Sequence, residues 1–351
     1  MTNQPATPLL LTADELLESD LLRLAAAAGV GLEVRREPDE AARAWATASV
    51  VLVGADQADL VVRAGLPRRD QVFVVAPGAA DDGLYRAAVG VGATSVVELP
   101  DSDGWIVELL TDAVDEVRGR GVVVAVVGGS GGVGATVLTA ALALTAGRSG
   151  RALAVDLDPL GPGLRRLIGV EDAPAVTWRE LADSRGRLGS RALRDALPGV
   201  GEVRVLGHAE DDLSPPAATV LREALSAGRR GHDWVVVDLP RGADPRTVPA
   251  LGGCDHVVLV ARAALSAVAS AARVADRLRD EASSLGVVVR TGGGTATPAE
   301  VARAVGVQLL AELPEQRRLD EHLDLGLGPV HARRSPLART ARHLLDRLDV
   351  R

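Results

Sequence analysis

Short apolar runs alternate with segments of helical periodicity along the first third of the chain. The apolar runs predict strands at Leu9–Thr12, Gly31–Arg35, Ser49–Val53, Gln71–Val75 and Thr94–Leu99. Apolar residues three or four positions apart predict helices at Glu15–Ala28, Asp39–Ala48 and Trp105–Val117. This alternation, over roughly the first 118 residues, is typical of a flavodoxin-like, doubly wound parallel sheet.

A second alternation begins at Val122, after the run Arg118-Gly119-Arg120-Gly121. Its strands are predicted at Val122–Val127, Ala152–Val155, Val203–Leu206, Trp234–Val237, His256–Ala261, Gly286–Arg290 and Gln308–Leu310. Its main helices are predicted at Ala135–Ala146, Pro216–Ala227, Leu265–Leu285, Pro298–Ala304 and Leu337–Leu348. The run Val122–Val127 is apolar without polar alternation, as the buried strands of parallel sheets require. We therefore predict an α/β protein with a first domain at residues 1–118, a linker at 119–121 and a second domain at 122–351.

Composition narrows the classes of function. The 351 residues include 47 acidic and 39 basic side chains, which gives a net charge of −8. An acidic chain binds nucleic-acid phosphates poorly, so we expect no specific nucleic-acid partner. Every basic residue is an arginine, which excludes Schiff-base chemistry and any phosphate site that depends on a lysine.

The number of cysteines and the length of the apolar runs indicate where in the cell the protein is expected. The single cysteine, Cys254, excludes internal disulfides and cysteine-rich metal sites. No positive stretch precedes the first apolar run, and no apolar run reaches the roughly 18 residues of a spanning helix. We therefore expect a cytoplasmic protein.

A glycine-rich loop joins the strand Val122–Val127 to the helix Ala135–Ala146. It reads Gly128-Gly129-Ser130-Gly131-Gly132-Val133-Gly134-Ala135-Thr136. Glycines permit positive φ and leave backbone N–H groups uncovered, and a helix N-terminus attracts anions, so the loop predicts a phosphate site. One alternative is a nicotinamide-dependent oxidoreductase, because Gly129, Gly131 and Gly134 with Asp156 on the next strand fit a dinucleotide fingerprint. Another is a scaffold that binds no nucleotide.

Three motifs together favour a different nucleotide site. Gly131–Thr136 resembles the deviant P-loop of MinD/ParA-type Walker ATPases, whose loop reads K-G-G-x-G-K-T/S. Val155–Pro159 looks like that family's second motif, a strand that ends in Asp-x-Asp, and Trp234–Pro240 looks like its Walker B strand. The resemblance implies bound ATP and Mg²⁺. Phosphates would lie on Gly131, Gly132, Val133, Gly134, Ala135 and Thr136, and Mg²⁺ on Thr136, Asp156 and Asp238, with Asp156 also orienting water.

A receiver-like domain fused to a deviant P-loop domain resembles the CpaE/TadZ-like branch of the family. The lysine-free loop and the sequences Val-Asp-Leu-Asp-Pro and Val-Val-Asp-Leu-Pro-Arg look like the actinobacterial, septum site-determining members of that branch. That branch implies a positioning protein for the septum or for Flp/Tad pilus assembly. It would act as a nucleotide-stabilised homodimer with secretion, pilus or division partners and peripheral membrane contact. The residues after Ala311-Glu312-Leu313-Pro314 would lie near the adenine.

The sequence departs from the family pattern at both lysines. Ser130 stands at the signature position and Ala135 at the P-loop position. A lost charge-assisted hydrogen bond removes about 1.5–3 kcal/mol, so we expect weakened ATP binding and little or no hydrolysis. Arg241 is the nearest candidate for a compensating cation, and Arg262, after the strand His256–Ala261, is another. Arg290 and Thr291 stand where the family often has an adenine-binding Asn.

The two ends of the chain carry their own alternatives. In the first domain Asp56 follows the third strand, where receivers carry their phospho-acceptor, but no lysine follows the fifth strand. We therefore expect a degenerate receiver used for docking or dimerisation. The last helix, Leu337–Leu348, has an apolar face that either packs on the sheet or reaches a membrane.

Overall fold

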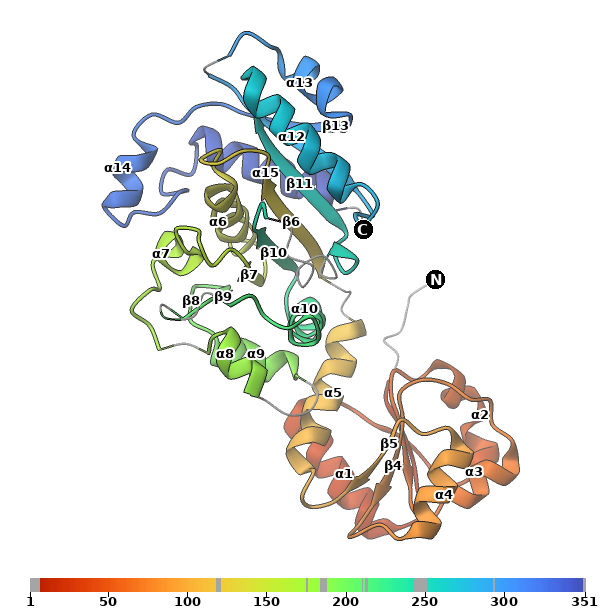
Figure 1. The fold of residues 1–351 in the computed structure, drawn as a ribbon. Helices are drawn as coiled ribbons and strands as arrows, with labels where there is room; N and C mark the ends of the chain where they lie inside the picture. The colour runs from red at the N-terminus through yellow and green to blue at the C-terminus, as the bar shows by residue number, and fades with distance from the viewer. Residues whose placement is uncertain are drawn as a thin grey trace. The chain divides into compact units, whose positions relative to one another are not determined.

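The computed structural model describes residues 7–117, 121–174, 176–183, 188–209, 211, 214–242, 251–292 and 294–349. The chain divides into two compact units, Met1–Arg120 with Gly189–Ala192 and Gly121–Leu188 with Leu193–Arg351 (Figure 1). Most of the predicted linker, residues 119 and 120, lies outside the described residues.

The first unit is built on a five-stranded parallel sheet of order β2-β1-β3-β4-β5. Its strands are β1 (Leu9–Leu11), β2 (Glu33–Arg35), β3 (Val51–Gly54), β4 (Val72–Ala76) and β5 (Ser95–Glu98). Its helices are α1 (Glu15–Ala28), α2 (Pro38–Thr47), α3 (Ala58–Ala64), α4 (Asp82–Val91) and α5 (Asp103–Val117). This strand order is that of the flavodoxin-like sheet that the sequence predicts.

Helices cover both faces of this sheet because its strands are apolar on both sides. Leu10 and Leu52 contribute to a core with α1 and α5, whereas Leu9 and Leu11 contribute to one with α2, α3 and α4. Trp45 of α2 is fully buried in the second core, and its indole N–H donates to the Pro67 carbonyl at 2.9 Å.

The second unit contains an eight-stranded sheet of order β13-β12-β11-β6-β10-β7-β9-β8. The strands are β6 (Val122–Gly128), β7 (Ala152–Asp156), β8 (Gly199–Val200), β9 (Val203–Leu206), β10 (Trp234–Leu239), β11 (His256–Arg262), β12 (Leu285–Arg290) and β13 (Gln308–Leu313). Every described pairing is parallel except that of β8 with β9, which is antiparallel. The sequence predicts β9 but not β8, which has only two residues.

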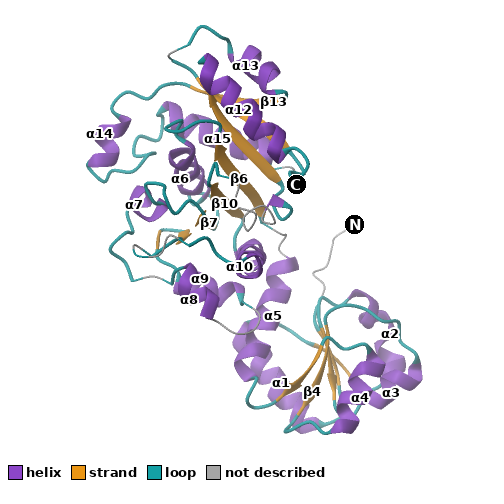
Figure 2. Cartoon of the chain, in the orientation of Figure 1, coloured by secondary structure: helices purple, strands orange, loops and turns teal. Residues whose placement is uncertain are grey.

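The helices of the second unit lie on both faces of its sheet (Figure 2). They are α6 (Ala135–Ala146), α7 (Leu164–Ile168), α8 (Trp178–Asp183), α10 (Ala218–Gly231), α12 (Leu265–Leu278), α13 (Pro298–Val305), α14 (Leu319–Asp324) and α15 (Pro336–Leu348), together with the end of α9 (Ser190–Ala196), whose first three residues belong to the first unit. The helix predicted at Leu265–Leu285 is too long, because it ends at Leu278 and Leu285 instead begins β12, opposite Val257 of β11.

Candidate functional site

The glycine loop lies between β6 and α6, in the middle of the second sheet. Gly132 and Gly134 have positive φ angles of 65° and 93°, a conformation that favours glycine. A Cβ on Gly131 or Gly132 would meet no atom within 4 Å, so the loop is open on that side. Gly134 begins α6 without a side-chain cap, which leaves the first N–H groups of a twelve-residue helix for an anion.

A cavity of about 1140 Å³ opens over this loop, large enough for a nucleotide. It is lined by the residues of the loop, by the turn after β7, by Pro215 and by the end of β10. Arg290 at the end of β12, the end of β13 with the segment after it, and Leu337 of α15 complete the lining. The carboxyl ends of parallel strands meet at one edge of a sheet, which is why segments far apart in the sequence share this cavity.

Asp238 lies at the base of the cavity, near the end of β10. Its side chain is 1% exposed, and Oδ1 accepts a hydrogen bond from the Thr139 hydroxyl at 3.3 Å. Oδ2 is buried and has no hydrogen-bond partner. The pKa of Asp238 is raised to about 8, mainly because the carboxyl group is buried and secondly because Asp156 is close to it. Hydrogen bonds from Thr136 and Thr139 lower this pKa but do not offset the increase. A buried carboxylate oxygen without a partner is costly unless a ligand occupies it.

Mg²⁺ fits this arrangement. It prefers oxygen ligands and keeps water and substrate phosphates in its shell, and Asp238 and Thr136 both line the cavity beside the glycine loop. Among the described residues, no group of three or more His, Cys, Asp or Glu could hold a metal ion on its own. A cation here would therefore depend on phosphate oxygens and water for the rest of its ligands.

Asp156 and Asp158 have different surroundings. Asp156 accepts the N–H of Asp158 at 3.1 Å on Oδ1 and the N–H of Leu164 at 2.8 Å on Oδ2, so both its oxygens hold the turn after β7. Burial raises its pKa to about 6. The residues that line the cavity include Asp158 and not Asp156. A direct metal or water contact of Asp156 stays a prediction.

The two lysine positions of the family pattern both reach the cavity. Ser130 and Ala135 line it, and the described cationic side chains that line it are Arg241 and Arg290. Arg241 is exposed, and its carbonyl accepts a hydrogen bond from Arg277 at 2.8 Å. Arg290 is the last residue of β12 and lies beside the loop. In the sequence, this residue stands out only because it occupies the position where the family often has an adenine-binding Asn.

The far side of the cavity is mostly apolar. It includes Leu313, Pro314, Leu319 and Leu337, together with the Gln316 side chain, which accepts the N–H of Leu337 at 3.4 Å. These residues lie where the family resemblance places the adenine. A mostly apolar wall with one amide and the Asp320 carboxylate suits a flat heterocycle better than it suits a phosphate.

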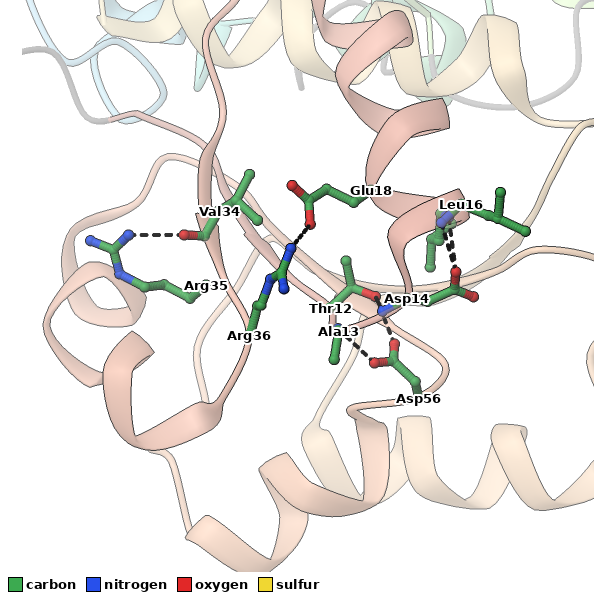
Figure 3. Close-up of polar contacts among 10 residues, drawn as sticks. Thr12, Ala13, Asp14, Leu16, Glu18, Val34, Arg35, Arg36 and Asp56 are labelled. Carbon is green, nitrogen blue, oxygen red and sulfur yellow. Dashed lines mark hydrogen bonds and ion pairs between the residues drawn. The ribbon is translucent and has the colours of Figure 1, made fainter.

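The first unit has a polar cluster at the ends of β1 and β3 (Figure 3). Asp56 accepts the Thr12 hydroxyl at 2.8 Å, the Ala13 N–H at 2.7 Å and the Gln57 amide at 2.9 Å. Asp14, the neighbouring acid, caps α1 by accepting the N–H groups of Leu16 and Leu17. Asp56 therefore serves as a structural acceptor that ties the two strand ends together.

The last helix buries its apolar face. Leu337, Ala341, Leu344 and Leu348 of α15 are at most 4% exposed, and the helix contacts α6 and β13. Of the two alternatives for this helix, packing on the sheet is the one found. Within the described residues, no helix is long and apolar enough to cross a membrane.

Comparison with protein families assigns each unit separately. Residues 11–121 match the model "Rv3660c-like, CheY-like N-terminal domain", and residues 122–287 match the model "Cellulose biosynthesis protein BcsQ". The first match agrees with the receiver-like prediction. The second covers the glycine loop and the two strands that carry Asp156 and Asp238.

Individual proteins are similar either to nearly the whole chain or to a part of it. The uncharacterized protein Rv3660c of Mycobacterium tuberculosis is 39% identical over 340 residues, which cover 95% of this chain and 96% of that protein. A putative septum site-determining protein MinD from Nephroselmis olivacea is 26% identical over 209 residues, 56% of this chain and 75% of that protein. The structure of the septum site-determining protein MinD from Pyrococcus horikoshii, complexed with Mg-ADP, superposes with a TM-score of 0.56 at 22% identity over 65% of this chain and 96% of that chain.

Proposed function

This chain belongs to the family of Mycobacterium tuberculosis Rv3660c and combines a CheY-like domain with a MinD/ParA-type P-loop domain, and from this we propose that it is an ATP-binding positioning protein. One observation carries the proposal. Asp238 lines the cavity beside the uncapped, glycine-opened start of α6, and its Oδ2 atom is buried without a hydrogen-bond partner. A Mg²⁺–triphosphate supplies both the cation and the anion that this pair of features lacks.

Each part of the site has one role in the proposed complex. The N–H groups of Gly131–Thr136 bind phosphate oxygens, and Thr136 and Asp238 hold Mg²⁺, which neutralises phosphate charge when bound. Asp156 fixes the turn that carries Asp158, and we place Asp158 rather than Asp156 beside the phosphates. The apolar wall after β13 receives the base.

Turnover is proposed to be slow or absent. Ser130 and Ala135 cannot supply the positive charge that family lysines bring to the transferring phosphate. Such charges contribute factors of about 10³–10⁵ to the rate of phosphoryl transfer. Nucleotide binding, and not nucleotide hydrolysis, would then control assembly.

Nucleotide binding is proposed to promote assembly of the protein. The MinD relatives are septum site-determining proteins, and we extend that role to this chain as a nucleotide-stabilised homodimer that positions division or Flp/Tad pilus machinery. Residues 1–118 would be the docking or dimerisation domain and residues 122–351 the nucleotide domain. Because α15 is packed against α6 and β13, any peripheral membrane contact would use another surface.

Calorimetric titration of the full chain tests the proposal. ATP, ADP and NAD⁺ are each titrated with and without Mg²⁺, against the wild type and against Asp238→Ala. We expect Mg²⁺-dependent ATP binding that Asp238→Ala abolishes. NAD⁺ binding without Mg²⁺, retained in Asp238→Ala, would instead support the oxidoreductase alternative. Absence of heat with all three ligands would support a scaffold that binds no nucleotide.

A further inference from the structure

Arg290 is the cavity arginine that lies against the glycine loop. Its Nη1 atom is 3.9 Å from the position that a Cβ on Gly134 would occupy, and Gly134 is the residue from which α6 begins. The guanidinium group therefore lies over the turn that carries the helix N-terminus. In the family pattern, the absent P-loop lysine is the very next residue, Ala135.

The position of Arg290 is fixed by the sheet and not by a loop. It is the last residue of β12 and is in register with Arg262 of β11 on one side and with Leu313 of β13 on the other. Its side chain is 27% exposed, so the aliphatic part is largely covered while the charged end reaches the cavity. A guanidinium held in this way loses little freedom on binding an anion.

The present partner of Arg290 is a weak one. Glu315 lies with Oε1 4.0 Å from Nη2, at the outer limit of an ion pair, and its own side chain is 64% exposed. Exposed ion pairs of this kind contribute little, because water screens them. A polyphosphate that enters the cavity would replace Glu315 as the partner of this cation.

The charges around the cavity make such a cation necessary. Asp158, Asp238 and Asp320 line it, so a triphosphate would otherwise meet mainly negative side chains. Arg241, the other arginine on the lining, is exposed and lies beyond the end of β10. Guanidinium groups bind phosphate oxygens in two-point contacts, which suits this task.

We propose that Arg290 binds the nucleotide phosphates and supplies, from the end of β12, the positive charge that the loop lacks at Ala135. This inference rests on the proposed ATP site and deepens it. It assigns Arg290 to the phosphates and not to the base, which is the role of the family residue that it replaces in the sequence. In this proposal the positive charge comes from the end of β12, which is separated in the sheet from β6 by β11.

The test compares Arg290→Gln with two matched variants of the full chain. Arg262→Gln removes the exposed arginine that ends the adjacent strand, and Arg241→Gln removes the other arginine on the cavity. Binding of Mg²⁺–ATP is measured by calorimetry, and binding of adenosine, which carries no phosphate, by ligand-observed NMR. Thermal unfolding followed by circular dichroism reports separately whether each variant stays folded.

We expect Arg290→Gln to weaken Mg²⁺–ATP binding by about ten- to a hundredfold and to leave adenosine binding unchanged. Arg262→Gln should bind ATP as the wild type does, and Arg241→Gln should weaken it less than Arg290→Gln. Adding Ala135→Lys to Arg290→Gln should restore most of the ATP affinity, and Arg290→Lys should keep more of it than Arg290→Gln.

Three results would overturn the assignment. Unchanged ATP binding by Arg290→Gln, in a wild type that binds ATP, removes the role of Arg290 and leaves the ATP site standing. Equal losses for ATP and adenosine would make Arg290 a base-reading residue. A wild type that binds no ATP in the presence of Mg²⁺ removes the proposed function itself, and this inference with it.

Discussion

Asp238 and Asp156 are directly opposite each other in the parallel pair β10–β7, yet their oxygens have different partners. Asp156 gives both oxygens to backbone N–H groups, whereas Asp238 keeps Oδ2 buried without a partner. Burial raises the pKa of both, to about 6 for Asp156 and to about 8 for Asp238. The first carboxylate is part of the scaffold, and the second is available to a ligand.

The stability of the Mg²⁺-free protein should fall as pH rises. The pKa of Asp238 rises from 3.8 to about 8 on folding, so its stabilising contribution is complete below about pH 4 and is lost up to about pH 8. We expect Asp238→Asn to remove about 3 kcal/mol of the stability difference between pH 5 and pH 8. Urea unfolding in EDTA at the two pH values measures this, and parallel curves for variant and wild type would contradict it.

Binding of Mg²⁺–ATP should release a proton from Asp238. Because the metal needs the ionised carboxylate, affinity should increase by up to about tenfold per pH unit between pH 6 and pH 8. Calorimetry in two buffers of different ionisation enthalpy detects the proton. The control is the same pair of titrations at about pH 9.5, where the Asp238 carboxyl of the wild type is already ionised and has no proton to release. Identical heats for the wild type in both buffers at about pH 7 would count against the site.

Ala135→Lys should strengthen ATP binding. Ala135 is the first residue of α6 and lines the cavity, so a lysine there can reach the phosphates. One charge-assisted hydrogen bond corresponds to about ten- to a hundredfold in affinity. The control is Ala135→Gln, which adds a polar chain without the charge. Equal affinities for the two variants would show that phosphates do not lie at this loop.

Truncation of the buried face of α15 should destabilise the second unit. Leu344 is fully buried against α6, so Leu344→Ala should reduce the free energy of unfolding by about 2–5 kcal/mol. Leu325→Ala is the matched control, because Leu325 is 65% exposed and its loss should change stability by less than about 1 kcal/mol. Similar effects of both substitutions in urea unfolding would mean that α15 does not pack as described.

Asp56 should act as a structural residue of the first unit. Asp56→Ala removes the acceptor for the Thr12, Ala13 and Gln57 donors and should lower stability by about 1–3 kcal/mol. Asp59→Ala, at an exposed position in α3, is the control. Intact mass after incubation with acetyl phosphate should show no phosphoryl adduct on the wild type, and an adduct lost in Asp56→Ala would restore the receiver interpretation.

Local signals in the sequence determined the two doubly wound units and the place of the glycine loop. Apolar runs such as Val122–Val127 and Trp234–Val237 reveal buried parallel strands because both faces of each strand must be apolar. Glycines at 132 and 134 mark the loop because the backbone there needs positive φ. The sequence predicts β9 at its observed bounds, whereas β8, with only two residues, is too short to show a periodicity along the chain.

Only the tertiary structure decided what each site residue does. Asp156 and Asp238 look alike in sequence, as acids at or near strand ends, and differ only in which N–H groups and hydroxyls surround them once the chain is folded. Arg290 reaches Gly134 because β12 lies in the same sheet as β6, with β11 between them. Hydrogen bonds and charges between distant segments depend on strand order, and periodicity along the chain does not encode that order.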